Sequence, residues 1–469
     1  MKPRPAIPAG PYLIVGLARS GVAAARTLRA LGQEVIGVDA GAPPAAQELA
    51  EEGFELHLGE DGVAQLDRVG AVVKSPGVPA RAPAIAAARA RGLTVLGELE
   101  LAWRLLEQEF IAVTGTNGKT TTVELIGHIH REAGLPVVVA GNVGVALSGL
   151  VGGIEKRATV VCEASSFQLE DTLAFAPEAA VLLNITPDHL DRHGTMAAYR
   201  EAKLQAFAHQ DAADVAVLPS APEGEAVFPP ELLASLRARL VRFGSGPQAD
   251  CALREGRLWW GAQPLLGVDE LRLRGAHNVE NALAGAAVCL ARGVDPAAVC
   301  SGLRSFAGVA HRLEEVARRE GVLFVNDSKA TNIASTLVAL AAFDTASTGA
   351  AGGGARTDGG ARIHLILGGR GKGQDFRPLR VPVRASCRAV YLIGEDAPVI
   401  ARELGGEGPD GVGVPLRDCR ELERALTAAA GAAAAGDVVL LSPACASFDQ
   451  FADYEDRGQA FRALVASLG

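Results

Sequence analysis

The sequence predicts an α/β protein with three domains, at residues 1–97, 98–310 and 311–469. A length of 469 residues is enough for about three domains of ordinary size. Short apolar runs recur along the whole chain, and most of them end at a glycine or proline turn that leads into a helical stretch. These runs do not alternate between apolar and polar residues, which is typical of parallel strands covered by helices on both faces.

Bulk composition excludes several classes of function. The formal net charge of −9 leaves no chain-wide basic surface, which argues against nucleic acid as a partner. Seven cysteines, an odd number without a Cys-x-x-Cys pair, indicate reduced thiols. The beginning of the chain lacks the features of a signal peptide, and no apolar window is long enough for a membrane span. We therefore expect a cytoplasmic protein. We also expect a monomer.

The first domain is predicted to be Rossmann-like. A strand at 12–15 leads into the turn Gly16-Leu-Ala-Arg-Ser-Gly21 and a helical run, and the next strand ends at Asp39. This arrangement is similar to a dinucleotide-binding fingerprint. Ala18 replaces its middle glycine, so a pyrophosphate could not approach the backbone as closely. By itself the fingerprint supports a nucleotide site and a plain tight turn equally.

The second domain is predicted to hold a phosphate-binding loop. An apolar strand at 110–114 runs into Gly115-Thr-Asn-Gly-Lys-Thr120, and a helix is predicted from Thr121. Such a loop directs backbone N–H groups and the positive end of a helix at an anion. Lys119 adds a charge, and Thr120 or Thr121 can offer an oxygen to Mg²⁺. The alternative is a tight strand-to-helix turn with an exposed lysine.

Two further strand ends of this domain carry possible metal ligands. One predicted strand ends at Glu163, and another, at 180–185, runs into His189. Because ligands collect outside the carboxyl ends of parallel strands, we expect both residues to face the loop. Oxygen atoms suit Mg²⁺, so Thr120 and Glu163 fit better than His189 does. Alternatively, Glu163 caps the helix that begins near Ser165, and His189 bonds to its own turn.

The remaining candidates are less specific when taken singly. Lys203 lies in a helical stretch beside an apolar face, which indicates a solvated lysine. Asn278 and Asn281 share one helix face and could bind a purine edge or cap the helix. Lys329 and Lys372 follow strands of the third domain, where we expect them to bind an acidic substrate. The Ala/Gly-rich spacer at 345–360 is predicted to be a flexible surface loop.

Taken together, the motifs resemble the Mur ligase family. They lie in order over nearly the whole chain: Gly115–Thr120, Glu163–Leu169, Asn184–Arg192, His277–Asn281, Asn326–Asn332 and Leu441–Phe451. The last two are similar to those of the members that add D-glutamate. The Asp-Asn-Pro-Arg motif of the members that add diaminopimelate or lysine does not occur.

The resemblance implies an ATP-dependent amide synthesis for peptidoglycan precursors. ATP would phosphorylate the carboxylate of UDP-N-acetylmuramoyl-L-alanine, and the amine of D-glutamate would then displace phosphate from the acyl phosphate. The implied catalytic residues are Lys119, His189 and Lys203. Two Mg²⁺ ions are implied, one held by Thr120 and Glu163 and one by His189 and Lys203. Lys203 would act as a carbamate formed with CO₂, which reverses the interpretation from its helix alone.

The resemblance also implies which residues bind each substrate. ATP would contact Gly115, Thr116, Asn117, Gly118, Lys119, Thr120, Thr121, Asn278, Asn281, Arg312, Asp327 and Lys329. The UDP-substrate would contact Arg19, Ser20, Asp39, Ser75, Gly77, Asn142, Ser165 and Gln168. D-Glutamate would contact Thr331, Lys372, Ser447, Phe448 and Tyr454. The sequence departs from the family pattern at Ala18, Ala40 and Gly41, which bears on the uridine contacts.

Other functions remain open at this point. A related amide ligase such as a folylpolyglutamate synthase would share most of the motifs. A nucleotide-dependent switch protein would use the loop without forming an amide. A dehydrogenase is disfavoured because Ala18 spoils its fingerprint. In the ligase, the third domain is expected to close over the nucleotide, because an acyl phosphate must be kept from water.

Overall fold

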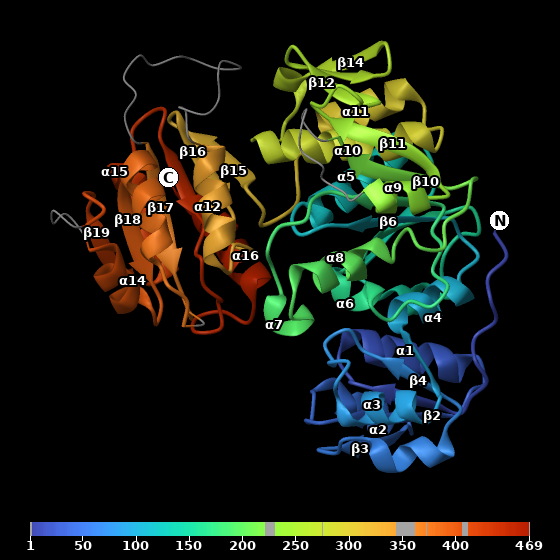
Figure 1. Ribbon diagram of the computed structural model, residues 1–469. Helices are drawn as coiled ribbons and strands as arrows, with labels where there is room; N and C mark the ends of the chain where they lie inside the picture. The colour runs from blue at the N-terminus through green and yellow to red at the C-terminus, as the bar shows by residue number, and fades with distance from the viewer. Residues whose placement is uncertain are drawn as a thin grey trace. The chain divides into compact units, whose positions relative to one another are not determined.

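The computed structural model describes residues 2–220, 230–273, 275–343, 362–371, 373–405 and 411–468 (Figure 1). The chain packs as two compact units, one of Met1–Leu271 with His277–Phe306 and one of Arg272–Ala276 with Ala307–Gly469. The described residues form three sheets rich in parallel strands, and one sheet lies in each of the three predicted sequence ranges. The predicted α/β class is therefore confirmed.

The first sheet has the strand order β3-β2-β1-β4-β5 and is parallel throughout. The chain leaves β1 toward β2 on one side and returns to β4 on the other, so the carboxyl ends of β1 and β4 form the crevice where ligands bind in open α/β sheets. The elements are β1 (Tyr12–Val15), α1 (Arg19–Ala30), β2 (Val35–Asp39), α2 (Ala45–Glu51), β3 (Glu55–Leu58), η1 (Val63–Arg68), β4 (Ala71–Lys74), α3 (Pro83–Ala90) and β5 (Thr94–Gly97).

The central sheet, β14-β13-β12-β11-β10-β9-β6-β8-β7, is parallel from β7 to β12 and ends in two antiparallel strands. Its strands are β6 (Phe110–Thr114), β7 (Val137–Gly141), β8 (Thr159–Glu163), β9 (Ala179–Leu182), β10 (Val215–Pro219), β11 (Arg239–Gly244), β12 (Cys251–Arg254), β13 (Arg257–Trp260) and β14 (Gln263–Gly267). Its helices are α4 (Glu98–Leu105), α5 (Lys119–Glu132), η2 (Leu147–Leu150), α6 (Ser166–Leu169), α7 (Leu190–His193), α8 (Met196–Leu204), α9 (Pro230–Ser235), η3 (Val268–Glu270), α10 (Ala276–Ala291) and α11 (Pro296–Ser305).

Two predicted boundaries in this region were wrong. Helix α5 begins at Lys119 rather than Thr121, because Gly118 takes the N-cap position with a left-handed backbone. Strand β9 ends at Leu182 rather than residue 185, since Asn184 already bonds to the glycine loop.

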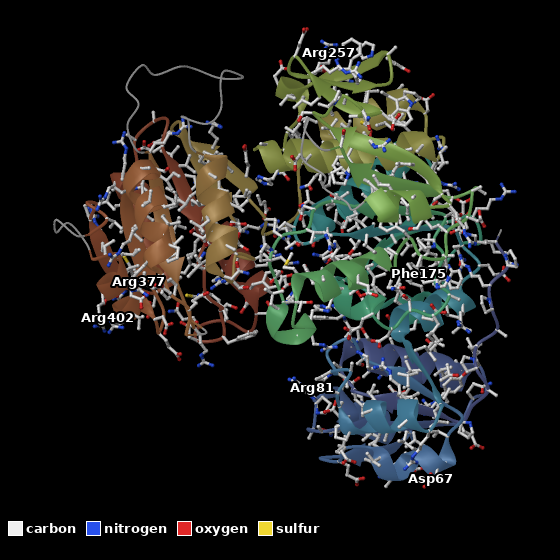
Figure 2. All side chains as sticks on the ribbon, viewed as in Figure 1. Asp67, Arg81, Phe175, Arg257, Arg377 and Arg402 are labelled. Carbon is white, nitrogen blue, oxygen red and sulfur yellow. The ribbon has the colours of Figure 1, made fainter. Side chains whose placement is uncertain are left out.

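An aromatic cluster anchors the core behind these strands. Phe175, labelled in Figure 2, belongs to this cluster. It lies edge-on to Trp103 and to Phe110, with ring centroids 5.8 and 6.2 Å away.

The second unit holds the sheet β15-β16-β20-β17-β18-β19, parallel except for β15. Alternate residues of its strands enter two cores on opposite faces: Leu323 and Val325 pack with α12 to α14, and Phe324 packs with α15 and α16. The elements are β15 (Glu314–Arg319), β16 (Val322–Asn326), α12 (Ile333–Ala342), β17 (Ile363–Gly368), η4 (Arg377–Leu379), α13 (Arg380–Ser386), β18 (Cys387–Ile393), α14 (Ala397–Leu404), β19 (Leu416–Arg420), α15 (Leu422–Ala432), β20 (Val438–Leu441) and α16 (Tyr454–Ser467). The spacer predicted at 345–360 lies outside the described residues.

A buried ion pair joins the first sheet to the central one within the first unit. The Nζ atom of Lys74, at the end of β4, lies 2.6 Å from Oδ2 of Asp171, and both side chains are buried. Two further residues complete the cluster. Glu170 Oε1 lies 3.2 Å from Lys74 Nζ, and Arg89 Nη2 lies 3.1 Å from Asp171 Oδ1. Burial raises the pKa of Asp171, whereas Lys74 and Arg89 act against that rise. Pairing therefore offsets a desolvation cost that neither charge could sustain alone.

This cluster predicts an asymmetric response to mutation. Lys74→Met should lower the free energy of unfolding by about 3–5 kcal/mol, because Asp171 would stay buried without its main cation. Urea denaturation followed by circular dichroism measures the change. Arg89→Met is the control: its side chain is 45% exposed, so the loss should stay near or below about 1 kcal/mol. Equal effects of the two substitutions would show that Lys74 has no special role.

Candidate active site

The glycine loop between β6 and α5 has the geometry of an anion site. Gly115 and Gly118 adopt φ values of 147° and 84°, which only glycine adopts readily. Gly118 is the N-cap residue of α5, so the positive end of that helix faces the loop. Among the described residues, no side-chain hydrogen bond caps this helix end. A phosphate group fits such a terminus.

Two lysines meet at one carbonyl of this loop. The Nζ atom of Lys119 donates to the carbonyl oxygens of Gly115 and Thr116 at 2.9 and 2.8 Å. Lys203, on α8, donates to the same Gly115 oxygen at 2.7 Å. Lys203 is 1% exposed, so the prediction of a solvated lysine was wrong. Burial, and secondarily the charge of Lys119, lowers the pKa of Lys203 to about 7.

The predicted magnesium ligands Thr120 and Glu163 lie together. Thr120 Oγ1 donates to Glu163 Oε2 at 2.8 Å, and Asn142 Nδ2 donates to Glu163 Oε1 at 2.9 Å. The capping interpretation of Glu163 was wrong, because Ser165 caps α6 and forms a reciprocal pair with Gln168. A buried carboxylate beside a hydroxyl at a phosphate loop is a donor set that suits Mg²⁺.

His189 lies at the beginning of α7, next to the same loop. Its side chain is about half exposed, and its Nε2 lies 3.5 Å from Asp188 Oδ2, so it contacts its own turn as well. The ring centroid of His189 lies 6.4 Å from that of Tyr199, and Lys203 Nζ lies 4.5 Å from the same Tyr199 ring. Within the described ranges, no group of three or more His, Cys, Asp or Glu has metal-binding geometry. A metal here would need the hydroxyl of Thr120 or a modified Lys203.

The predicted adenine contacts lie against the loop as well. Asn281 Nδ2 donates to Asn278 Oδ1 at 3.1 Å inside α10, so the two side chains are linked along one helix face. A Cβ atom added to Gly118 would lie 2.2 Å from Asn281 Oδ1. This contact and the left-handed backbone at Gly118 disfavour a larger residue at position 118, and the contact places Asn281 beside the loop.

The residues predicted to bind the UDP-substrate lie around the crevice of the first sheet. Both carboxylate oxygens of Asp39 accept backbone N–H groups at 2.8 Å, one from Leu17 and one from Gly41. Ser75 Oγ donates to the Gly16 carbonyl at 2.7 Å across the switch between β1 and β4. Arg19 reaches the Asn142 carbonyl at 2.7 Å. Ser20 is the second residue of α1, Gly77 lies on the loop after β4, and Ser165 and Gln168 lie at α6.

The second unit carries its predicted residues at the ends of β16 and β20. Asp327 accepts hydrogen bonds from Ser442 Oγ at 2.8 Å and from the Leu313 N–H at 3.2 Å. Lys329 Nζ lies 5.1 Å from the centre of the Tyr454 ring. The remaining predicted residues are Arg312 and Thr331 on the β16 side, buried Ser447 and exposed Phe448 after β20, and Lys372, which lies outside the described residues.

Sequence reasoning missed two arginines at these sites. Arg192 of α7 donates to the carbonyls of residues 76, 77 and 78 at 2.9–3.4 Å and so ties the Ser75–Gly77 loop to the helix of His189. Arg457 of α16 is buried beneath the β16 and β20 loops. Its position three residues after Tyr454, on the same helix face, was the available signal.

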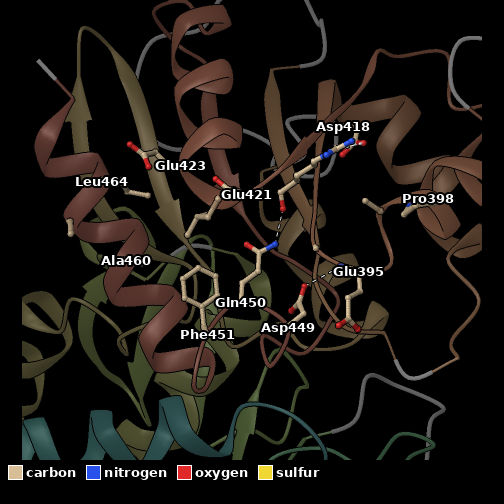
Figure 3. A pocket seen from close by; sticks show the side chains of 15 residues that line it. Glu395, Pro398, Asp418, Glu421, Glu423, Asp449, Gln450, Phe451, Ala460 and Leu464 are labelled. Carbon is tan, nitrogen blue, oxygen red and sulfur yellow. Dashed lines mark hydrogen bonds and ion pairs between the residues drawn. The ribbon is translucent and has the colours of Figure 1, made fainter.

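A cleft of about 990 Å³ in the second unit does not coincide with these residues (Figure 3). It lies at the ends of β18 and β19. Phe451 and Leu464 form an apolar part of its wall. Its carboxylates are Glu395, Asp418, Glu421, Glu423 and Asp449, and its lining includes one arginine, Arg420. These carboxylates would repel a dicarboxylate. We therefore do not place the acidic substrate in this cleft.

Among the residues described, no helix is both long and apolar enough to cross a membrane.

Three family models match successive parts of the chain. Models of the MurD-like N-terminal domain, the Mur ligase middle domain and the Mur ligase glutamate ligase domain match residues 11–97, 113–289 and 311–445. A UDP-N-acetylmuramoylalanine–D-glutamate ligase of Acidobacterium capsulatum is 42% identical over 97% of this chain and 95% of its own length. One from Pelotomaculum thermopropionicum is 39% identical over 97% of both chains.

Solved structures share the fold. The structure of a UDP-N-acetylmuramate-alanine ligase from Thermotoga maritima matches with a TM-score of 0.57 at 19% identity, over 98% of this chain and 100% of the other. At that identity the likeness concerns the fold alone. With three family models in order along the chain and relatives near 40% identity over almost its full length, this chain belongs to the Mur ligase family.

Proposed function

We propose that the protein is an ATP-dependent ligase that joins D-glutamate to UDP-N-acetylmuramoyl-L-alanine in peptidoglycan precursor synthesis, and thereby serves cell growth and division. The observation that carries the proposal is the loop at Gly115–Thr120, where Thr120 meets Glu163 and two lysines share one carbonyl. The identity of the amino acid rests on the names of the similar ligases. The proposal includes a cytoplasmic monomer with domains at 1–97, 98–310 and 311–469.

In the first step, the loop would hold the phosphates of ATP. Its N–H groups and Lys119 would neutralise charge as the terminal phosphoryl group passes to the substrate carboxylate, which forms an acyl phosphate and ADP. Bound Mg²⁺ would supply further charge neutralisation through Thr120 and Glu163. Asn278 and Asn281 would contact adenine, because their linked side chains lie beside the loop.

In the second step, the amine of D-glutamate would attack the acyl phosphate. A carbon–nitrogen bond forms, the carbon–oxygen bond to phosphate breaks, and the amine loses a proton. Hydroxyl and ammonium donors suit the two carboxylates of the amino acid, which is the role we propose for Thr331, Ser447 and Lys372, with Phe448 and Tyr454 beside them.

Lys203 is proposed to work as a carbamate. Its pKa near 7 means that much of the amine is neutral at physiological pH, and only a neutral amine attacks CO₂. A carbamate would replace an ammonium group that Lys119 repels with an anion that Lys119 attracts. With His189, which flanks the same Tyr199 ring, it would offer oxygen and nitrogen to a second Mg²⁺.

Asp327 is proposed to contact the ribose of ATP, and its environment gives it an unusual titration. Burial raises the pKa of Asp327 to about 7, while hydrogen bonds from Ser442 and the Leu313 backbone oppose the rise. At neutral pH the carboxyl group is thus poised between a proton donor and an acceptor, and either form can bond to a hydroxyl.

The proposed reaction predicts a strict substrate dependence. With ATP, Mg²⁺ and UDP-N-acetylmuramoyl-L-alanine present, amide product should form with D-glutamate and not with L-glutamate or L-alanine, as measured by mass spectrometry and phosphate release. A folate acceptor in place of the UDP-substrate should give no product. Phosphate release that does not depend on D-glutamate would overturn the proposal, and nucleotide binding without amide formation would indicate a switch protein.

The carbamate predicts a chemical rescue. Lys203→Ala should lose activity by about 100-fold or more, as expected for a group required in the transition state, and short carboxylates such as acetate should restore part of it. Lys203→Arg is the matched control, because it keeps a positive charge yet cannot form a carbamate and should not be rescued. Unaltered turnover of Lys203→Ala would remove the carbamate from the mechanism.

The titration of Asp327 predicts a pH-dependent stability. An acid whose pKa rises on folding stabilises the folded state only while protonated, so its contribution is lost as pH rises toward 7. Asp327→Asn does not titrate, and its free energy of unfolding relative to the wild type should therefore increase by about 2–3 kcal/mol between pH 5 and pH 8. Chemical denaturation at several pH values measures this. A constant difference would show that Asp327 titrates normally.

A further inference from the structure

Arg457 is a buried cation at the centre of the second unit's strand-end loops. Its side chain is 1% exposed. Its Nε donates to Ser328 Oγ at 3.0 Å, and its Nη2 donates to the carbonyls of Ser328 and Cys445 at 2.8 and 3.1 Å. The third nitrogen, Nη1, has no hydrogen-bond partner among the described residues. One guanidinium group therefore joins the loop after β16 to the loop after β20.

A third loop, after β17, closes on the same group. Arg370 and Ala446 exchange backbone hydrogen bonds of 2.9 and 3.0 Å, which fix this loop to the one after β20. A Cβ atom on Gly369 would lie 2.3 Å from the Ala446 carbonyl and 3.2 Å from Arg457 Nη1. Glycine at 369 thus allows the backbone to pass directly over the unpartnered nitrogen.

No ion pair to Arg457 is present in the described part of the chain, although Cys445 and Asp449 both act to raise its pKa. Burial lowers the pKa of Arg457 to about 10, which still leaves it protonated at neutral pH. A buried cation without a counter-ion is costly. It lowers the energy of any anion that binds near it.

The loops that Arg457 joins carry proposed contacts of the acidic amino acid. Thr331 lies three residues after Ser328, and Ser447 lies two residues after Cys445. Ser328 Oγ also donates to the Tyr454 carbonyl at 2.8 Å, so the beginning of α16 belongs to the same arrangement. The guanidinium therefore joins the loops on which these side chains lie.

We propose that Arg457 is the positioning residue for the acceptor amino acid: it holds the loops of Thr331 and Ser447 together, and its unneutralised charge favours a dicarboxylate. This inference rests on the proposed function, and it adds a group that acts on the second step without touching ATP or the acyl phosphate.

The test separates the two half-reactions. Hydroxylamine can replace D-glutamate in the second step, where its nitrogen bonds to the acyl carbon as phosphate leaves, so hydroxamate formation reports acyl phosphate without the amino acid site. Arg457→Lys and Arg457→Met should raise the KM for D-glutamate by about 10- to 100-fold, the range for one charged hydrogen bond, with the larger rise for methionine. Hydroxamate formation and the KM for the UDP-substrate should change less than about threefold.

Arg424→Lys serves as the matched control, because this arginine of α15 is 70% exposed and should leave every constant unchanged. If Arg457→Met does not fold, Ser328→Ala removes one partner of the guanidinium and should raise the KM for D-glutamate in the same direction. An unchanged KM for D-glutamate, or a parallel loss of both half-reactions with falling Tm, would overturn the inference. A wild type that forms no D-glutamate product would instead overturn the proposed function.

Discussion

Two ammonium groups share the carbonyl oxygen of Gly115, and the nucleotide half of the site depends on this contact. Lys119 reaches this oxygen from the first turn of α5, and Lys203 reaches it from α8. The glycine loop, α5 and α8 are therefore joined at one atom. Two like charges at one carbonyl repel each other, which favours either a neutral Lys203 or a nearby anion. The loop is therefore organised to be completed by negative charge, whether from phosphate or from a carbamate.

Buried charges in this protein fall into two kinds, and the difference separates structure from function. Lys74 lies within ion-pair distance of Asp171 and Glu170, and its role is to hold the first sheet against the central one. Lys203 and Arg457 are just as buried, but among the described residues their hydrogen bonds go to backbone carbonyls and a hydroxyl. Because an unneutralised buried charge is costly, its retention at strand ends indicates a ligand of the opposite sign.

The sequence was sufficient to locate many of the buried parallel strands, because these are continuous apolar runs, but it placed the end of β9 three residues too late. The sequence did not show which other parts of the chain bury a given side chain. The spacing around Lys203 identified the helix but not the loop and Tyr199 that bury it. Local reasoning left open whether Glu163 caps the nearest helix, whereas its partners come from α5 and the loop after β7. The partners of Arg457 include backbone carbonyls of two other loops, which leave no side-chain pattern to detect.

The missing glycine at Ala18 has a structural explanation that also bears on function. The close approach in the first loop occurs at Gly21, where a Cβ atom would lie 1.9 Å from the Gly16 carbonyl, so position 18 is free to carry a side chain. Asp39 uses both of its oxygens on the Leu17 and Gly41 N–H groups. In a dinucleotide fold the corresponding acid binds ribose hydroxyls. Here Asp39 fixes the loop as well, and because each of its oxygens accepts only one of these N–H groups, each retains a lone pair that is able to accept a ligand hydroxyl.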